Sequence, residues 1–291
     1  MQNKNIFYTL GIILFLVFFY SLFLNPPSNF KPGTIVQIQP GMGLRNISLE
    51  LKNENIIRSR LAFEFFAILF GGEKHIISAG YLFDNKTSVW QVAKRIVRGD
   101  HHLPPVVATI PEGFNKNEIA DVYISKLANF NKNNFLLKAK EGYLFPDTYY
   151  FFTTDNEIKV MEHMSKNYEK KITPIRPEIL ASGRTEKEII TMASIIEKEA
   201  KGASDRGIIS GILWKRINQG MPLQVDAAPE TYKTKGLPEN PISNPGLEAI
   251  HAAIYPQSSP YLYYLHDKEG NTYYAKTFAE HKANKAKYLN K

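Results

Sequence analysis

Hydrophobic and polar positions recur with helical or strand periodicity along most of the chain, but the first residues lack this pattern. Residues 6–24, IFYTLGIILFLVFFYSLFL, carry no charge. A run of this length can cross the hydrocarbon layer of a bilayer as a helix. A cleaved signal peptide would have a shorter apolar region ending in a small-x-small site, whereas NPPSNFKPG follows here. The pattern predicts one uncleaved transmembrane helix over 6–24, a cytoplasmic tail over 1–5 and a large C-terminal part outside.

A loose repeat follows a proline-rich linker over 25–35. Residues 36–57, 80–99 and 107–127 each show a short strand pattern, a polar turn and an apolar helix pattern. Units of this kind cannot bury a face alone, so we expect them to pack together as one small α+β module over 36–137. Between the first two, residues 59–72 predict a buried helix that stops at a Gly-Gly pair.

The pattern of hydrophobic and polar positions changes at residue 138, and helical periodicity dominates from there on. Helices are predicted over 156–172, 185–200 and 204–220, and the last residues predict a surface helix. Thr185 and Glu188 have the spacing of a capping box at the start of the second helix. We therefore predict an α+β fold, with a mainly helical domain with short strands over 138–291.

Composition narrows the function classes. The 291 residues are 44% hydrophobic and 22% charged, which is globular, and they include no cysteine, which excludes disulfides and thiolate metal sites. The net charge is +8, but the basic residues are scattered. We therefore expect no nucleic-acid partner, and an anionic surface such as phospholipid or cell-wall polymer instead. The histidines have no metal-ligand spacing, and neither a phosphate-binding loop nor a G-x-S-x-G elbow occurs, so no metal and no cofactor are expected.

Two glutamates, Glu197 and Glu199, end the apolar run TMASIIEKEAKG. At about 100° per residue they fall on opposite flanks of the apolar arc, so they cannot both point into one cleft. One interpretation is a solvated helix end with ordinary surface ion pairs. The other is one acid at the edge of the core, where partial burial would raise its pKa and keep it protonated as a general acid. The helical wheel does not choose between them.

The stretch EGYLFPDTYYF, residues 141–151, combines acids with aromatic side chains around a proline. Aromatic residues in such a place often fill a domain core. Glu141 and Asp147, interleaved with Tyr143 and Tyr149, could equally line a carbohydrate groove, because sugars offer apolar faces for stacking and hydroxyls for carboxylates. Composition alone favours neither interpretation.

Taken in order, several motifs resemble the YceG-like (MltG) endolytic murein transglycosylases, from about residue 5 to the C-terminus. They are IPEG, EGYLFPDTYYF, ASIIEKEA, LQVDAAP, GLPENPISNPGLEAIHAAIYP and PYLYYLHDKEGNTYYAKTFAEHKAN. The resemblance implies that the module over 36–137 is LysM-like, that the domain over 138–291 is catalytic, and that the chain is held by a single-pass anchor in the inner membrane with its domains in the periplasm.

The resemblance also implies site residues. The catalytic acid is the second glutamate of the EKE element, Glu199, with Glu197 as the runner-up. The implied peptidoglycan groove is lined by Glu141, Tyr143, Asp147, Tyr149, Gln224, Asp226 and Tyr232.

The implied activity is cleavage of the bond between N-acetylmuramic acid and N-acetylglucosamine in nascent strands, giving 1,6-anhydro ends and terminating strand elongation. Peptidoglycan synthases (penicillin-binding proteins) are implied partners. Two alternatives remain. One is a non-enzymatic peptidoglycan-binding scaffold of the wall-synthesis machinery, and the other is a hydrolase that uses Glu199 with Asp226 and leaves reducing ends.

The chain departs from the family pattern in two places. The segment over 225–238 is shorter than in family members, with Val225 where a threonine is usual and Glu230 where an asparagine is expected. Thr272 stands where a histidine often precedes the final strand.

Overall fold

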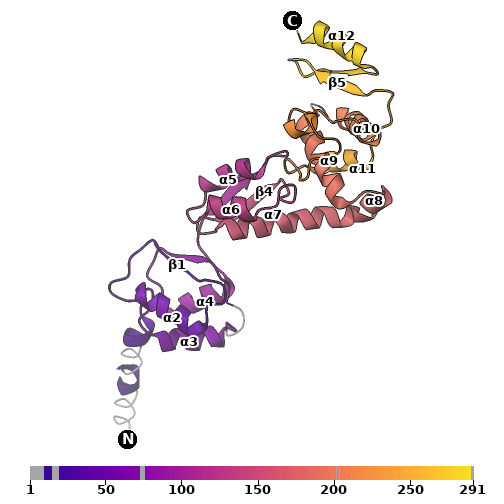
Figure 1. The fold of residues 1–291 in the computed structure, drawn as a ribbon. Coiled ribbons are helices and arrows are strands. Elements are labelled where there is room, and N and C mark those ends of the chain that lie inside the picture. The colour runs from indigo at the N-terminus through magenta and orange to yellow at the C-terminus, as the bar shows by residue number, and fades with distance from the viewer. Residues whose placement is uncertain (1–9, 15–19, 73–75, 201, 203, 290–291) are drawn as a thin grey trace. The chain divides into compact units, whose positions relative to one another are not determined.

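The computed structural model describes residues 10–14, 20–72, 76–200, 202 and 204–289. Two compact units divide the chain. The first comprises residues 1–106 with 152–155, and the second comprises 107–151 with 156–291 (Figure 1). Both mix helices with short two-stranded sheets, so the α+β part of the predicted fold class is confirmed. The assignment of 36–137 to a LysM-like module and of 138–291 to a catalytic domain stays a prediction.

The prediction of a membrane-spanning helix over 6–24 is wrong. Among the described residues, no helix is long and apolar enough to cross a membrane. Of that range, residues 10–14 are helical and Tyr20–Leu24 form the π-helix η1. The predicted inner-membrane localisation loses its support with the helix. The rest of that range, 6–9 and 15–19, and the predicted tail over 1–5 lie outside the described residues.

In the first unit, one antiparallel ribbon lies with three helices. Strand β1 (Thr34–Gln37) pairs with β2 (Gly80–Phe83), Val36 opposite Tyr81. Helices α2 (Leu44–Asn53), α3 (Arg60–Leu69) and α4 (Val89–Arg98) complete it, and α3 contacts both others. The core takes alternate strand residues and one stripe of each helix, as the two periodicities require.

Helix α3 is less buried than its sequence predicts. Phe63 and Ala67 are fully buried, but Leu61, Phe65 and Ile68 on other faces are exposed. A ten-residue helix in so small a unit presents only one stripe to the core. Its start and stop are as predicted: the Ser59 side chain accepts from the backbone of the first turn, and the Gly-Gly pair follows.

The second unit contains most of a second ribbon, residues 107–109 and 148–151, and the helices that follow it. Strand β3 (Pro105–Thr109) pairs with β4 (Thr148–Phe152), and helices α5 (Lys116–Ile124), α6 (Lys132–Lys138), α7 (Glu157–Ile172) and α8 (Arg176–Ala181) follow, with the 3₁₀ turn η2 (Thr173–Ile175). The third sequence repeat, 107–127, therefore contributes β3 and α5 to this unit rather than joining the first two repeats.

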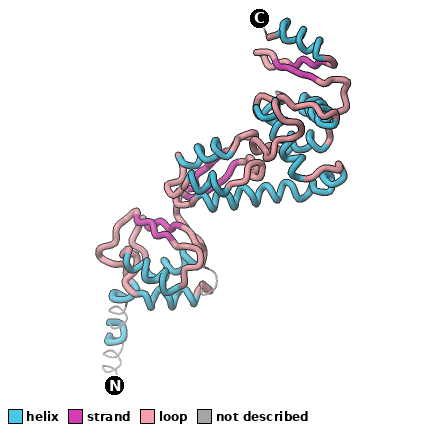
Figure 2. The backbone as a smooth tube through the Cα atoms, in the orientation of Figure 1, coloured by secondary structure: helices cyan, strands magenta, loops and turns pink. Residues whose placement is uncertain are grey.

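Helix α9 (Glu186–Glu199) is the centre of the second unit. Every residue over 189–196 is buried, which marks a helix enclosed on all sides. Helices α10 (Asp205–Asn218) and α11 (Leu247–Ile254) pack on it. The capping box of Thr185 and Glu188 is confirmed. The Ser194 hydroxyl of α9 accepts from the backbone N of Ile242 at 3.0 Å, which ties the loop before α11 to the helix. Helices and loops make up most of the backbone in Figure 2, and the strands are short.

The C-terminal part is a third ribbon and a last helix. Strands β5 (Tyr263–His266) and β6 (Thr272–Ala275) pair antiparallel, with Tyr264 opposite Tyr274. The 3₁₀ turn η3 (Pro229–Tyr232) precedes them in the chain, and helix α12 (Phe278–Tyr288) contacts both strands. This ribbon brings a tyrosine of β5 to the end of α9, where the candidate site begins.

Candidate active site

The two glutamates at the end of α9 have different partners. The Glu197 side chain is 7% exposed and accepts from Arg206 Nη2 at 3.2 Å. Its Oε2 also accepts from the backbone N of Gly246, the N-cap of α11, at 2.9 Å. Carboxylates are favoured at a helix N-terminus because its amides are unsatisfied. Glu197 therefore joins α9, α10 and α11.

Glu199, the last residue of α9, is half-buried beside the C-terminal ribbon. The Tyr264 hydroxyl donates to its Oε2 at 2.9 Å. Burial, and then the charge of Glu199, raise the pKa of Tyr264 well above its ordinary value of 10.0, so this hydroxyl remains a donor. The two glutamates thus point to separate environments, as their opposite flanks on the helical wheel predict.

A buried arginine joins a second predicted residue to this region. Arg216, in the last turn of α10, is 5% exposed and donates through Nη2 to Gln224 Oε1 at 2.8 Å. Its guanidinium lies over the Tyr263 ring, 5.5 Å from the centroid. Burial lowers the pKa of Arg216, and the phenols of Tyr264 and Tyr263 oppose that shift.

Gln224 has a strained backbone. Its φ is +53°, in the left-handed region, which costs a non-glycine residue about 1 kcal/mol. The backbone N of Gln224 donates to Thr231 O at 3.1 Å and Arg216 fixes its side chain. Such strain persists only where surrounding contacts enforce it, and it clusters at functional sites.

Asp226 and Tyr232 form a pair on the segment after Gln224. The Tyr232 hydroxyl donates to Asp226 Oδ1 at 2.5 Å. The pKa of Tyr232 is raised, first by that hydrogen bond and further by burial and by the charges of Asp226 and Glu199. Glu199, Gln224, Asp226 and Tyr232 therefore belong to one electrostatic neighbourhood, which the charge of Arg216 also reaches.

The other four predicted residues have contacts elsewhere in the unit. Glu141 accepts from the backbone N of Lys116 at 3.0 Å and from Asn244 Nδ2 at 2.7 Å. Burial raises the pKa of Glu141, and these hydrogen bonds oppose that shift. The Asn244 Oδ1 in turn accepts from the Leu144 backbone at 2.9 Å. Glu141 thus holds the loop over 139–144 in place.

Asp147 and Tyr149 share Asn167 of α7. Asn167 Nδ2 donates to Asp147 Oδ2 at 3.0 Å and to the Tyr149 hydroxyl at 3.1 Å. Asp147 is exposed, whereas Tyr149 is buried and donates to Phe145 O at 2.6 Å. Burial raises the pKa of Tyr149 to about 12, against the hydrogen bond from Asn167. Tyr149 therefore has the environment of a core residue.

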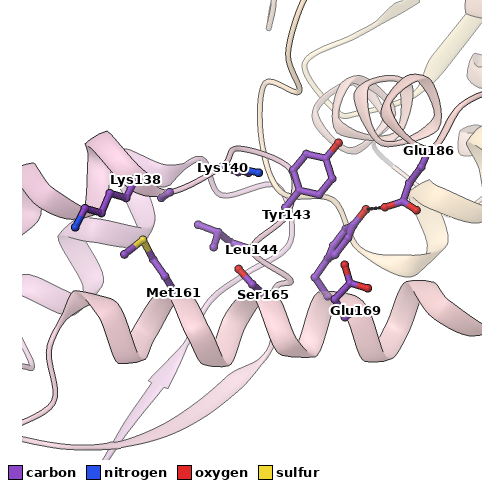
Figure 3. A pocket seen from close by; sticks show the side chains of 10 residues that line it. Lys138, Lys140, Tyr143, Leu144, Met161, Ser165, Glu169 and Glu186 are labelled. Carbon is purple, nitrogen blue, oxygen red and sulfur yellow. Dashed lines mark hydrogen bonds between the residues drawn. The ribbon is translucent and has the colours of Figure 1, made fainter. Parts of the chain in front are cut away.

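Tyr143 lines a pocket of about 570 Å³ beside α7 and the first turn of α9 (Figure 3). Its ring meets that of Tyr168 edge to face, with centroids 5.0 Å apart. The lining residues are Lys138, Ala139, Lys140, Tyr143, Leu144, Met161, Ser165, Tyr168, Glu169 and Glu186. Within the described part of the chain, no three His, Cys, Asp or Glu side chains come together as metal ligands would.

Sequence reasoning missed Arg216 and Tyr264. Arg216 follows buried Ile212 and Leu213 by four and three positions, so a cation stands where the helical period predicts a core residue. The sequence could therefore have indicated Arg216. It could not have indicated Tyr264, because only the pairing of β5 and β6 distinguishes this tyrosine from those around it.

Together these features define an α+β protein whose candidate centre is a carboxylate at the end of a buried helix, surrounded by phenols, an amide and a guanidinium. The model of the YceG-like family matches residues 36–230 and 229–287, so the chain belongs to the YceG-like family. The two matched stretches meet at residues 229–230, inside the segment over 225–238.

The chain is also similar to proteins of other bacteria. It is 26% identical over 305 residues to the endolytic murein transglycosylase of Bacillus subtilis, covering 87% of this chain and 84% of the relative. It is 26% identical to that of Streptococcus pneumoniae strain D39, covering 90% of this chain but only 60% of the relative. Among solved structures, a YceG-like protein of Listeria monocytogenes matches with a TM-score of 0.58 and 27% identity, over 87% of this chain and 99% of that one.

Proposed function

We propose that this chain is an endolytic peptidoglycan transglycosylase with Glu199 as its catalytic acid. The observation that carries the proposal is the contact of Glu199 with the Tyr264 hydroxyl, in the neighbourhood shared with Gln224, Asp226 and Tyr232. The substrate class comes from the relatives in Bacillus and Streptococcus, which are named endolytic murein transglycosylases. The chain spans 60% of the Streptococcus relatives, so their whole activity is carried over here as a proposal.

The reaction needs one carboxyl group in two protonation states. Protonated Glu199 first gives its proton to the oxygen between N-acetylmuramic acid and N-acetylglucosamine, and the bond from that oxygen to muramic C1 breaks. The glucosamine leaves with a 4-hydroxyl. The 6-hydroxyl oxygen of the muramic acid then bonds to C1, Glu199 takes up its proton, and the 1,6-anhydro ring closes. No water is consumed.

The surrounding groups have supporting tasks in this proposal. Tyr264 orients the Glu199 carboxylate, and Arg216 holds Gln224 toward the same region. Positive and polar groups placed before the reaction stabilise developing charge without reorganising. Glu197 is the weaker candidate, because Arg206 and the α11 N-terminus already engage it. Cleavage within nascent strands would end their elongation, beside the peptidoglycan synthases that extend them.

The proposal is tested by mass spectrometry of peptidoglycan strands incubated with the purified full chain. We expect anhydro-ended fragments from wild type and from Glu162→Gln, a control that removes an exposed surface carboxylate. Glu199→Gln should give none while keeping the wild-type circular dichroism spectrum. Cleavage that survives in Glu199→Gln but disappears in Glu197→Gln would move the catalytic role to Glu197.

A hydrolase is the second candidate, because Asp226 and Glu199 both act on Tyr232 and Tyr264. Two carboxyl groups flanking one bond could activate a water. Reducing ends in place of anhydro ends would establish this alternative, and Asp226→Asn would then abolish cleavage. Strand binding without any cleavage would identify a peptidoglycan-binding scaffold instead.

A further inference from the structure

The pocket beside Tyr143 lies at the other end of α9 from the candidate acid. Glu186 and Glu199 are the first and last residues of this helix, so they lie about 20 Å apart along its axis at a rise of about 1.5 Å per residue. Glu186 lines the pocket and Glu199 does not. The pocket is therefore a separate place on the same unit, and its lining includes none of the groups assigned above to bond cleavage.

The charges of the pocket are arranged by sign. Figure 3 shows Lys138 at one end of the pocket and Glu169 and Glu186 toward the other, with Lys140, Leu144 and Ser165 between these ends. Both lysines are exposed at the rim. A ligand that fits this arrangement carries carboxylate at one end, ammonium at the other and an apolar or amide stretch between.

The acidic end has a fixed geometry. Arg176 donates to Glu186 Oε2 through Nε at 2.8 Å and pairs through Nη2 with Glu169 at 2.9 Å. The Tyr168 hydroxyl donates to Glu186 Oε1 at 2.8 Å. These bonds hold the pKa of Glu186 below its ordinary value despite its burial. Two carboxylates share one guanidinium, so this end keeps a net negative charge that can receive an ammonium group.

The position of Lys140 is fixed by the loop that Glu141 anchors. Gly142 has a φ of +86°, and a Cβ there would lie 2.6 Å from the Pro241 side chain. The turn it allows, in which the Tyr143 backbone N donates to Lys140 O at 3.3 Å, places Lys140 and Tyr143 together on the pocket rim. Lys140 thus lies in a constrained turn.

We propose that this pocket binds a peptide of the peptidoglycan strand, with its carboxylates on Lys138 and Lys140 and its side-chain amine at Glu169 and Glu186. The inference rests on the proposed function for the substrate. Glycan hydroxyls are neutral and do not require charges of opposite sign at two ends, whereas the peptide attached to each muramic acid supplies both. A strand repeats that peptide along its length, so one is available at a distance from the bond beside Glu199.

Such a subsite suits cleavage inside a strand. A peptide held about 20 Å along α9 from the acid requires that the strand continue beyond the cleaved bond. A strand end lacking the next peptide would lose this contact, so the pocket would favour internal positions over terminal ones.

The test is direct binding of a sugar-free probe, N-acetyl-alanyl-γ-glutamyl-lysyl-alanine, to the full chain carrying Glu199→Gln, followed by calorimetry. We expect saturable binding that weakens about tenfold in Lys138→Glu/Lys140→Glu, since a charge-assisted contact of this kind is worth about 1.4 kcal/mol or more. The matched control is Lys126→Glu/Lys282→Glu, the same change of charge on exposed lysines outside the pocket lining, and it should bind as the parent does.

Two modified probes assign the ends. Amidating the probe's carboxylates should weaken binding to the parent and remove the difference between the parent and the Lys138→Glu/Lys140→Glu variant. Acetylating the lysine side chain should weaken binding to both by a similar factor. No saturable binding of the unmodified probe, or equal binding by the charge-reversed variant, would overturn the inference. Because this assay involves no cleavage, probe binding by a chain that never cuts strands would refute the proposed activity alone.

Discussion

At the scale of single residues, the hydroxyl of Tyr264 is the group that singles out Glu199. Its pKa is raised by burial and by the charge of Glu199, so it remains a donor at the pH of any ordinary assay. A neutral donor on one carboxylate oxygen orients the acid without adding a full charge beside it. Glu197, in contrast, has the full positive charge of the Arg206 guanidinium beside it.

Tyr264→Phe removes the donor and keeps the ring. We expect kcat/KM for strand cleavage to fall about tenfold to a hundredfold, because the acid loses its orienting bond, with the melting temperature little changed. Tyr255→Phe is the matched control, since it deletes an exposed tyrosine hydroxyl that donates to Glu178. Equal kcat/KM in the two variants would remove Tyr264 from the site.

Arg216→Met separates a positioning role from a structural one. Replacing a buried charge by an apolar side chain of similar size is often neutral or stabilising, and Arg216 Nε has no hydrogen-bond partner among the described residues. We therefore expect an unchanged or higher melting temperature, together with about a tenfold loss of kcat/KM from the released Gln224.

The control for Arg216→Met is Arg184→Met, which removes a guanidinium lying over the Trp214 ring at 4.0 Å. A cation–π contact is worth about 0.5–1 kcal/mol at a partly exposed site, so this variant should lose a little stability and keep its activity. A fall in the melting temperature of Arg216→Met with activity retained would make Arg216 a structural residue.

At the scale of elements, the sequence predicts features that lie within one helix, but it does not predict which distant elements contact each other. The capping box of Thr185 and Glu188 predicted the start of α9, because that chemistry is contained within four residues. The opposite flanks of Glu197 and Glu199 were likewise readable from the helical period. The partners of these acids come from α10, α11 and β5, which are distant in sequence, so no local pattern could identify them.

The turn at Gly142 offers an element-scale prediction. Gly142→Ala must place a Cβ 2.6 Å from Pro241, whereas Gly183→Ala, also at positive φ (+73°), meets nothing within 4 Å. Both substitutions carry the left-handed backbone cost of about 1 kcal/mol. Overpacking should add about 1–3 kcal/mol at Gly142 alone. Chemical denaturation of the two variants measures this difference, and equal destabilisation would show that the loop over 139–144 yields easily.

At the scale of the whole molecule, the compact units are not continuous stretches of the chain. Residues 152–155 belong to the first unit although the residues on both sides belong to the second. Phe152 lies 4.5 Å from the His101 ring, between centroids, a contact that no periodicity could predict. The spanning helix predicted over 6–24 rests on hydropathy alone, which reports the composition of a segment, and among the described residues no helix is long and apolar enough to cross a membrane.

The stability of the second unit depends on pH through the ionisation of Glu112. Burial, and then the charge of Glu197, raise the pKa of Glu112 above its ordinary value of 4.5, and Glu248 adds to the shift while Arg206 opposes it. A raised carboxyl pKa stabilises the fold below pH 4.5, and this contribution is lost as pH rises through the folded-state pKa. At neutral pH the ionised Glu112 therefore opposes folding.

Glu112→Gln should accordingly raise the melting temperature at pH 7, and the difference from wild type should close as the pH falls below 4.5, where both side chains are neutral. Glu239→Gln, at an exposed position, should show no such pH-dependent gap. A lower melting temperature for Glu112→Gln at pH 7 would mean that the attraction of Arg206 outweighs burial and the repulsion from Glu197. The cluster that holds Glu197 would then depend on Glu112 as a charge, and its ties to α10 and α11 would loosen in acid.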